Sequence, residues 1–157
     1  MGRGIAQISV QAGSTVLLFD MQADATRAAQ TAVFSQWDKL GEKGRLDAAQ
    51  VASYKSRLLC AQTLPAISDC DLIVEAVVER LDIKSGLFAE LEDIVRPTAV
   101  LATNTSSLSV TAIAAKLKRP GQFAGFHFFN PVPLMKVVEV IGGLKTAANT
   151  LHGLSQY

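Results

Sequence analysis

Residues 125–140, GFHFFNPVPLMKVVEV, contain the side chains best suited to acid–base chemistry. His127 lies among apolar residues, Asn130 follows it, and Glu139 interrupts a valine-rich run. This pattern predicts a buried strand that presents an imidazole at its end, a turn, and a second strand over 137–141. The turn would bring Glu139 back to His127, where a carboxylate fixes the imidazole tautomer and stabilises the charged ring. The alternative is a core histidine in a hairpin.

Short apolar segments alternate with helical patterns along the rest of the chain. Further strands are predicted at residues 15–19, 71–78 and 99–102, and helices at 4–12, 24–40, 47–59, 83–95, 109–117 and 147–154. Asp47 with Gln50 resembles a capping box, and Ser109 is placed to cap the next helix. Because the strands are apolar throughout, they predict a parallel sheet covered by helices on both faces.

The composition predicts a single soluble domain. The chain has 157 residues, 49% of them hydrophobic, and a net charge of +1 from 15 basic and 14 acidic residues. This balance gives no sign of a nucleic-acid or membrane partner. For Cys60 and Cys70 we expect reduced structural thiols in a cytoplasmic protein, and no residue spacing suggests a metal site.

The N-terminal segment carries part of a dinucleotide-binding pattern. Gly2 and Gly4 open the first helix, and Asp20 ends the strand that follows it. In a dinucleotide-binding βαβ unit, a glycine-rich turn approaches the pyrophosphate at a helix N-terminus, and an acid ending the second strand holds the ribose. Gly2 would be the third glycine of that turn. A flexible terminus and a surface aspartate is the alternative.

Polar residues also follow two other predicted strands. Glu75 and Glu79 frame the end of one, with Lys84 in the next helix, and residues 104–107 follow another. Ligands bind at the carboxyl ends of strands in open α/β sheets, so these groups are candidates. Ser106 is placed to bond a substrate hydroxyl, although a helix-capping role alone is possible. For Glu75 we favour a solvated loop charge.

Five motifs occur in a characteristic order, namely GRGIA at 2–6, VLLFD at 16–20, VEAVVE at 74–79, NTSSL at 104–108 and HFFNPVP at 127–133. Together they resemble the NAD-binding domain of L-3-hydroxyacyl-CoA dehydrogenases, including the bacterial 3-hydroxybutyryl-CoA type. The resemblance covers residues 1–157 as one domain. It implies an α/β, Rossmann-like, doubly wound fold with a mostly parallel sheet.

The resemblance also implies substrate-side roles. His127 would be the general base for the 3-hydroxyl proton, and Glu139 would orient and stabilise it. Ser106 would bind the substrate hydroxyl, and Asn130 would position the reacting groups. Lys43 would contact the CoA moiety of an acyl-CoA substrate.

On the cofactor side, the resemblance implies that Gly2 and Gly4 lie beside the NAD pyrophosphate. Asp20 would hold the adenosine ribose, which favours NAD because a 2′-phosphate would meet a negative charge. Glu79 and Lys84 match further cofactor-contacting positions. The implied function is NAD-dependent oxidation of (S)-3-hydroxyacyl-CoA to 3-oxoacyl-CoA, and the reverse, as in fatty-acid β-oxidation.

Two departures from the family pattern set further expectations. The family begins with a central strand before the point where this chain starts, and it continues into a helical domain that forms a homodimer. We therefore expect a fragment whose sheet has a gap, exposed strand edges, or another segment in the empty place. The alternative functions are a non-catalytic nucleotide-binding or interaction fragment and, against the HFFNP motif, a 6-phosphogluconate-type dehydrogenase.

Overall fold

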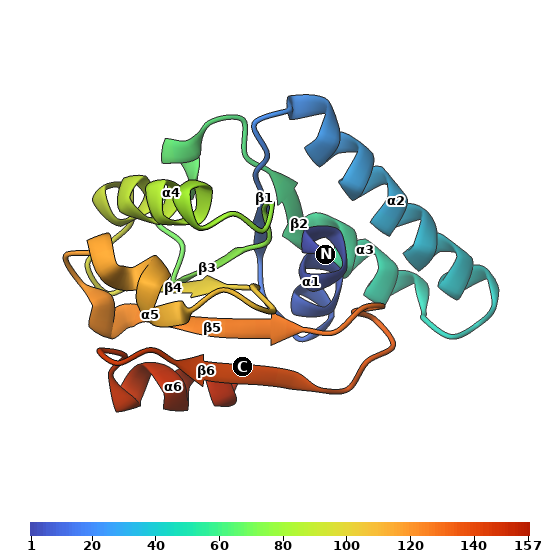
Figure 1. Cartoon of the computed structure of the whole chain (residues 1–157). Coiled ribbons are helices and arrows are strands. Elements are labelled where there is room, and N and C mark those ends of the chain that lie inside the picture. Colours follow the sequence, from blue (N-terminus) through green and yellow to red (C-terminus); the bar gives the residue numbers. More distant parts are fainter.

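The computed structural model describes residues 1–157, apart from the side chain of residue 23. Helices and strands alternate over most of its length (Figure 1). The helices are α1 (Gly2–Gln11), α2 (Ala23–Glu42), α3 (Ala48–Arg57), α4 (Leu81–Ile94), α5 (Val110–Ile113) and α6 (Ala148–Ser155). The strands are β1 (Val16–Leu18), β2 (Leu58–Cys60), β3 (Leu72–Glu75), β4 (Val100–Thr103), β5 (Phe123–Phe128) and β6 (Val138–Gly142).

The strands form two sheets. β1 pairs with β2 in parallel, and the larger sheet has the order β3-β4-β5-β6. In the larger sheet β3, β4 and β5 are parallel, while β6 runs antiparallel to β5. The predicted α/β class with a mostly parallel sheet is confirmed.

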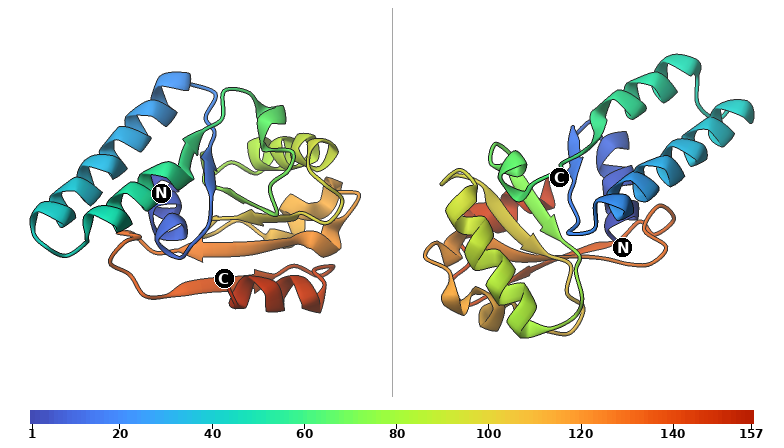
Figure 2. Two further views of the ribbon diagram at one scale, coloured as in Figure 1. Left: turned by 180° about the vertical axis from the view of Figure 1, so that it is seen from behind. Right: turned by 90° about the horizontal axis from the view of Figure 1, so that it is seen from above.

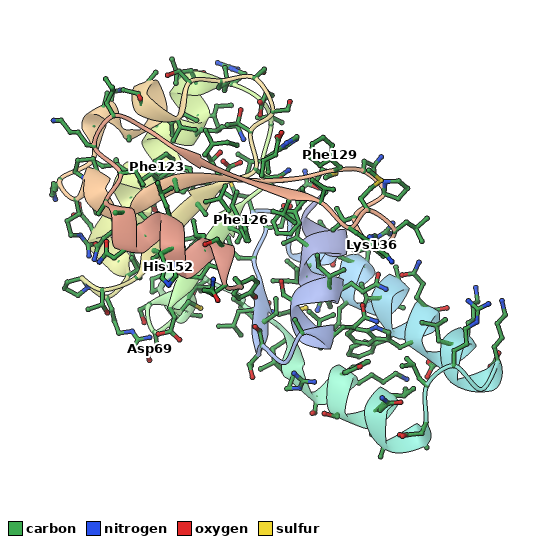
Figure 3. All side chains as sticks on the ribbon, turned by 90° about the horizontal axis from the view of Figure 1, so that it is seen from below. Asp69, Phe123, Phe126, Phe129, Lys136 and His152 are labelled. Carbon is green, nitrogen blue, oxygen red and sulfur yellow. The ribbon has the colours of Figure 1, made fainter. Side chains whose placement is uncertain are left out.

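Side chains along β5 alternate between two cores, as the two-residue period of a strand requires. Phe123 packs in a core with α4 and α5, and its ring meets that of Phe88 edge-on at 4.7 Å. Ala124, Phe126 and Phe128 pack in a second core with α1 and α6. Figure 3 labels Phe123 and Phe126 on β5 and His152 on the covering helix α6. The larger sheet is therefore covered on both faces.

A third core holds the antiparallel pair α2 and α3, which projects away from the larger sheet (Figure 2). At its centre Trp37 is fully buried, between the rings of Phe34 and Tyr54. The predicted capping box starts α3, since Asp47 and Gln50 each accept a hydrogen bond from the other's backbone N–H. Ser109 caps α5 as predicted, accepting from the backbone N–H of Ala112.

The predicted gap in the sheet is confirmed. Among the described residues β1 pairs only with β2, and β3 pairs only with β4. At this gap β1 and β3 each present an unpaired edge, although parallel strands are usually paired and buried on both sides.

Three predicted elements run at least two residues past the end of the observed element. The helix predicted over 47–59 is too long, because α3 ends at Arg57 and β2 follows it directly. The strand predicted over 71–78 ends at Glu75, and the helix predicted over 109–117 is a four-residue α5 followed by a 3₁₀ turn at Ala114–Lys116. Within the part of the chain that the structure describes, no helix has the length and apolar character of a membrane span.

Candidate active site

His127 and Glu139 form the predicted pair. They are directly opposite each other on the antiparallel strands β5 and β6. His127 Nδ1 lies 2.8 Å from Glu139 Oε2. The imidazole is 15% exposed and the carboxylate 53%. Since Nδ1 faces the carboxylate, the neutral ring carries its proton there and leaves its lone pair on Nε2.

His127 faces an open pocket of about 330 Å³ rather than a closed core. The pocket lies where β3, β4 and β5 end, which is the ligand-binding edge of an open α/β sheet. Its walls come from the loops after these strands and from the start of α1, with the residues Met1, Ala76, Val77, Glu79, Asn104, Ser106, His127, Phe128, Phe129 and Asn130. The structure thus brings His127, Ser106, Asn130 and Glu79 together.

The ring of Phe129 meets the imidazole of His127 edge-on, with ring centroids 4.7 Å apart. Figure 3 shows Phe129 and Lys136 on the segment that joins β5 to β6, beside α1. This packing restricts rotation of the imidazole, which the bond to Glu139 already orients.

Asn104 is a site residue to which the sequence pattern alone assigns no role. Its side-chain oxygen accepts a hydrogen bond of 2.8 Å from the backbone N–H of Phe128. Its own backbone N–H donates to the carbonyl of Glu75 at 2.8 Å. Asn104 therefore ties the ends of β3 and β5 together, next to His127. The available signal was an asparagine two positions after the strand predicted over 99–102.

Glu75 is buried, which corrects the expectation of a solvated loop charge. It is the last residue of β3, and its side chain is 1% exposed. Its carboxylate accepts hydrogen bonds from the ammonium of Lys84 at 2.7 Å, the hydroxyl of Thr103 at 2.7 Å and the backbone N–H of Val77 at 2.6 Å. A buried carboxylate needs such partners, because an unpaired charge is costly away from water.

Lys84 is equally buried, at 1% exposure, in the first turn of α4. Its ammonium lies between two carboxylates, 2.7 Å from Glu75 and 3.2 Å from Glu79. Lys84 is thus directed toward protein groups, and Glu79 stands between it and the pocket.

Glu79 organises the turn that carries Ser106. Its Oε1 accepts from the hydroxyl of Thr105, from the backbone N–H of Ser106 at 3.1 Å and from the hydroxyl of Ser107 at 3.3 Å. Partial burial acts to raise the pKa of Glu79, but the hydrogen bonds from Thr105 and Lys84 and the positive charge of Lys84 outweigh it. Together they lower the pKa from 4.5 to about 2. Glu79 is therefore an anion at neutral pH.

Gly2 and Gly4 place the start of α1 against the site. A side chain at Gly4 would bring its Cβ within 2.8 Å of the Cβ of Val132, so only glycine allows this approach. At Gly2 an added Cβ would lie 3.9 Å from its nearest neighbour, the Cβ of Ala76. Packing alone therefore does not demand glycine there. No side chain caps α1. The first N–H groups of a helix have no partner inside it and suit an anion.

Asp20 and Lys43 lie outside the pocket. Asp20 follows β1, is exposed, and accepts a 2.8 Å hydrogen bond from the backbone N–H of Gln22. Lys43 is exposed at the opposite end of α2, a helix of 20 residues that spans about 30 Å at 1.5 Å per residue. Across the described side chains, no group of three or more histidine, cysteine or acidic residues is placed to hold a metal ion, and Cys60 and Cys70 are free thiols.

Comparison with known proteins identifies relatives. The family described as "3-hydroxyacyl-CoA dehydrogenase, NAD binding domain" matches residues 1–157. The chain is 42% identical over 156 residues to 3-hydroxyadipyl-CoA dehydrogenase of Escherichia coli, covering 99% of this chain and 33% of that protein. It is 41% identical over 150 residues to a probable 3-hydroxybutyryl-CoA dehydrogenase of Bacillus subtilis, covering 96% of this chain and 52% of that protein.

Solved structures agree with the sequence matches. The crystal structure of 3-hydroxybutyryl-CoA dehydrogenase from Escherichia coli has a TM-score of 0.97 at 42% identity, covering 99% of this chain and 33% of that one. That of (S)-3-hydroxybutyryl-CoA dehydrogenase from Ralstonia eutropha has a TM-score of 0.94 at 35% identity, covering 99% and 55%. The chain spans about a third to about half the length of such relatives. It belongs to the family of NAD-binding domains of 3-hydroxyacyl-CoA dehydrogenases.

Proposed function

We propose that residues 1–157 form the NAD-binding domain, with the catalytic base, of an enzyme that interconverts (S)-3-hydroxyacyl-CoA and 3-oxoacyl-CoA. The observation that carries this proposal is the His127–Glu139 pair, 2.8 Å apart, in a pocket shared with Ser106 and Asn130. A histidine held by a carboxylate is suited to proton transfer near neutral pH.

In the oxidation direction, Nε2 of His127 would remove the proton of the 3-hydroxyl, and a bound nicotinamide would supply the acceptor for the hydride of C3. Glu139 stabilises the imidazolium that forms. Ser106 would donate a hydrogen bond to the substrate oxygen, and Asn130 would orient the substrate beside His127. In the reverse direction, the imidazolium of His127 returns the proton to the 3-keto oxygen.

The residues at the sheet edge fit a nicotinamide dinucleotide, whose ring supplies the hydride acceptor when bound. The open backbone at Gly2 and the uncapped start of α1 suit a pyrophosphate. Asp20, in the loop just after β1, would hold the adenosine ribose. Glu79, in the pocket wall, would face the nicotinamide half, while Lys84 acts on the cofactor only through Glu79.

An acyl-CoA substrate would enter this pocket with its 3-position at His127. We assign the CoA moiety to the projecting pair α2 and α3, where Lys43 is exposed. A cationic side chain there suits the phosphates of CoA.

The test measures whether the chain oxidises NADH with acetoacetyl-CoA as substrate. The readout is the fall in NADH absorbance. In parallel, residues 1–157 would replace the matching segment of the 42% identical Escherichia coli dehydrogenase. Turnover by this chimera that is lost in its His127→Ala variant supports the proposal, whether or not the chain alone turns over. A chimera that is folded but inactive, with no difference on changing His127, would refute it.

A second candidate is a nucleotide-binding domain without catalysis of its own. The gap between β1 and β3 favours it, because that gap separates Asp20 from the pocket at His127. Binding of NADH by the isolated chain, measured by nucleotide fluorescence, together with no turnover in chain or chimera, would favour this candidate.

A further inference from the structure

The buried pair of Glu75 and Lys84 lies behind the pocket wall. Lys84 acts above only through Glu79, and Glu75 has no part in the mechanism. Both side chains are 1% exposed. Core side chains of this size are normally apolar, and a buried ion pair seldom adds stability compared with apolar residues of the same volume. The contact of Lys84 with Glu79 suggests that the pair has a role other than stability.

These contacts form a continuous series of groups from the end of β3 to the pocket. Glu75 Oε1 lies 2.7 Å from the ammonium of Lys84, and Lys84 lies 3.2 Å from Glu79 Oε2. The other oxygen of Glu79 accepts from the backbone N–H of Ser106 at 3.1 Å. Each group contacts the next, and the last is the backbone of a pocket residue.

The three charges do not cancel. Two carboxylates share one ammonium, so the cluster of Glu75, Lys84 and Glu79 carries a net charge of −1. Glu79 is the member with access to water, at 38% exposure. Glu75 is held by a backbone N–H and a buried threonine hydroxyl as well as by Lys84, so it is the fixed end of the series.

We propose that Glu75 is a positioning residue: it holds the ammonium of Lys84 below the surface, and Lys84 in turn holds Glu79 against the backbone of Ser106. This inference rests on the proposed function, in which Ser106 contacts the substrate. Without the charge of Glu75, the ammonium keeps a single anionic partner and moves outward to water along its flexible stem. Glu79 follows it and releases the N–H of Ser106.

The test measures hydrogen exchange of the Ser106 amide by NMR, which requires no ligand and is therefore separate from the turnover assay. Glu75→Gln is expected to speed this exchange at least tenfold under conditions where the chain stays folded. Glu79→Gln is expected to give the same increase, and the double variant no more than either. Lys84, protected in the unaltered chain, is expected to become reactive to reductive methylation in Glu75→Gln.

Glu92→Gln is the matched control. Glu92 is 5% exposed and accepts from the backbone N–H groups of Lys118 and Arg119, but it does not line the pocket. Its loss should lower stability and leave the Ser106 amide unchanged. If Glu75→Gln behaves like Glu92→Gln, with Lys84 still unreactive, the proposal is overturned.

A variant that keeps the charge covers the case in which Glu75→Gln does not fold. Glu75→Asp withdraws the carboxylate from Lys84 by one methylene group. A smaller increase in Ser106 exchange is then expected, and no increase in this variant would overturn the proposal.

Discussion

Glu79 makes a pH-dependent contribution to stability that can be measured without any ligand. Its pKa is lowered from 4.5 to about 2 in the folded chain, where Thr105, Lys84 and Ser106 bind the anion. A group with a lowered folded-state pKa stabilises the fold above its unfolded-state pKa, and this contribution is lost as the pH falls through the folded-state value. The window is therefore pH 4.5 down to about pH 2.

The size of the effect follows from that shift and from exposure. At about 1.4 kcal/mol per pH unit, a shift from 4.5 to about 2 corresponds to at most about 3 kcal/mol. Glu79 is 38% exposed, so solvent screens its interactions, and we expect about 1–2 kcal/mol. Glu79→Gln should then be less stable than the unaltered chain by this amount at pH 7, and most of this difference should be lost at pH 2.

Urea unfolding followed by tryptophan fluorescence provides the assay. Trp37 is the chain's single tryptophan and is fully buried, so its emission reports the loss of the fold. Glu90→Gln changes an exposed glutamate on α4 and serves as the control, with no comparable loss expected. The reasoning is refuted if Glu79→Gln and the unaltered chain lose the same free energy of unfolding between pH 5 and pH 2.

Two further predictions concern packing and backbone contacts around the site. Gly4→Ala should lower the free energy of unfolding by about 1–3 kcal/mol, because its Cβ would meet Val132 at 2.8 Å. Gly86→Ala is the control, since Gly86 lies in α4 with no atom within 4 Å of the new Cβ, and it should raise the free energy of unfolding by about 0.5–1 kcal/mol. Equal effects of the two substitutions in urea unfolding would contradict the packing argument. Asn104→Ala should cost about 1–3 kcal/mol, since the N–H of Phe128 loses its acceptor; an unchanged exchange rate of that amide would count against the assigned bond.

The hairpin of β5 and β6 was predictable because its signals are local. Apolar residues surround His127, prolines mark the turn, and a valine-rich run follows, so the pairing of His127 with Glu139 needed only strand periodicity. The helix caps at Asp47 and Ser109 were predictable for the same reason, since each cap joins residues only three positions apart.

Features that depend on distant residues were not predictable. The strand β2 has three residues directly after a helix, and it forms because β1 offers an edge about 40 residues earlier in the chain. Nothing in the neighbourhood of Glu75 along the chain indicates that Lys84 and Thr103 enclose it, so the sequence favours a solvated charge there. The bond from Phe128 to Asn104 likewise joins residues 24 positions apart.

The predicted substrate and cofactor roles of the site residues did not come from local sequence patterns alone. Spacing alone left His127 open to two interpretations, a core histidine or a base, and left Gly2 with Asp20 as a partial pattern. The order of the five motifs resembles that of a known family, and this resemblance favoured a general base at His127 and NAD binding at Gly2 and Asp20. The structure adds the pocket in which His127, Ser106 and Asn130 meet, and Lys43 is not among the residues that line it.

The pair of His127 and Glu139 also sets the expected effects of substitutions on kcat. Removing a positioned general base costs about 10²–10⁴-fold in rate, so His127→Ala should lower kcat by that factor. At 2.8 Å, a carboxylate and an imidazolium attract by about 1.5 kcal/mol even at the dielectric constant of water. Glu139→Gln should therefore cost about tenfold.

The most direct measurement of the central claim is kcat for NADH oxidation with acetoacetyl-CoA in the chimera that carries residues 1–157. The account predicts turnover that falls about 10²–10⁴-fold in His127→Ala and about tenfold in Glu139→Gln, with NADH binding unchanged. Turnover that is unaffected by the loss of His127 would contradict it.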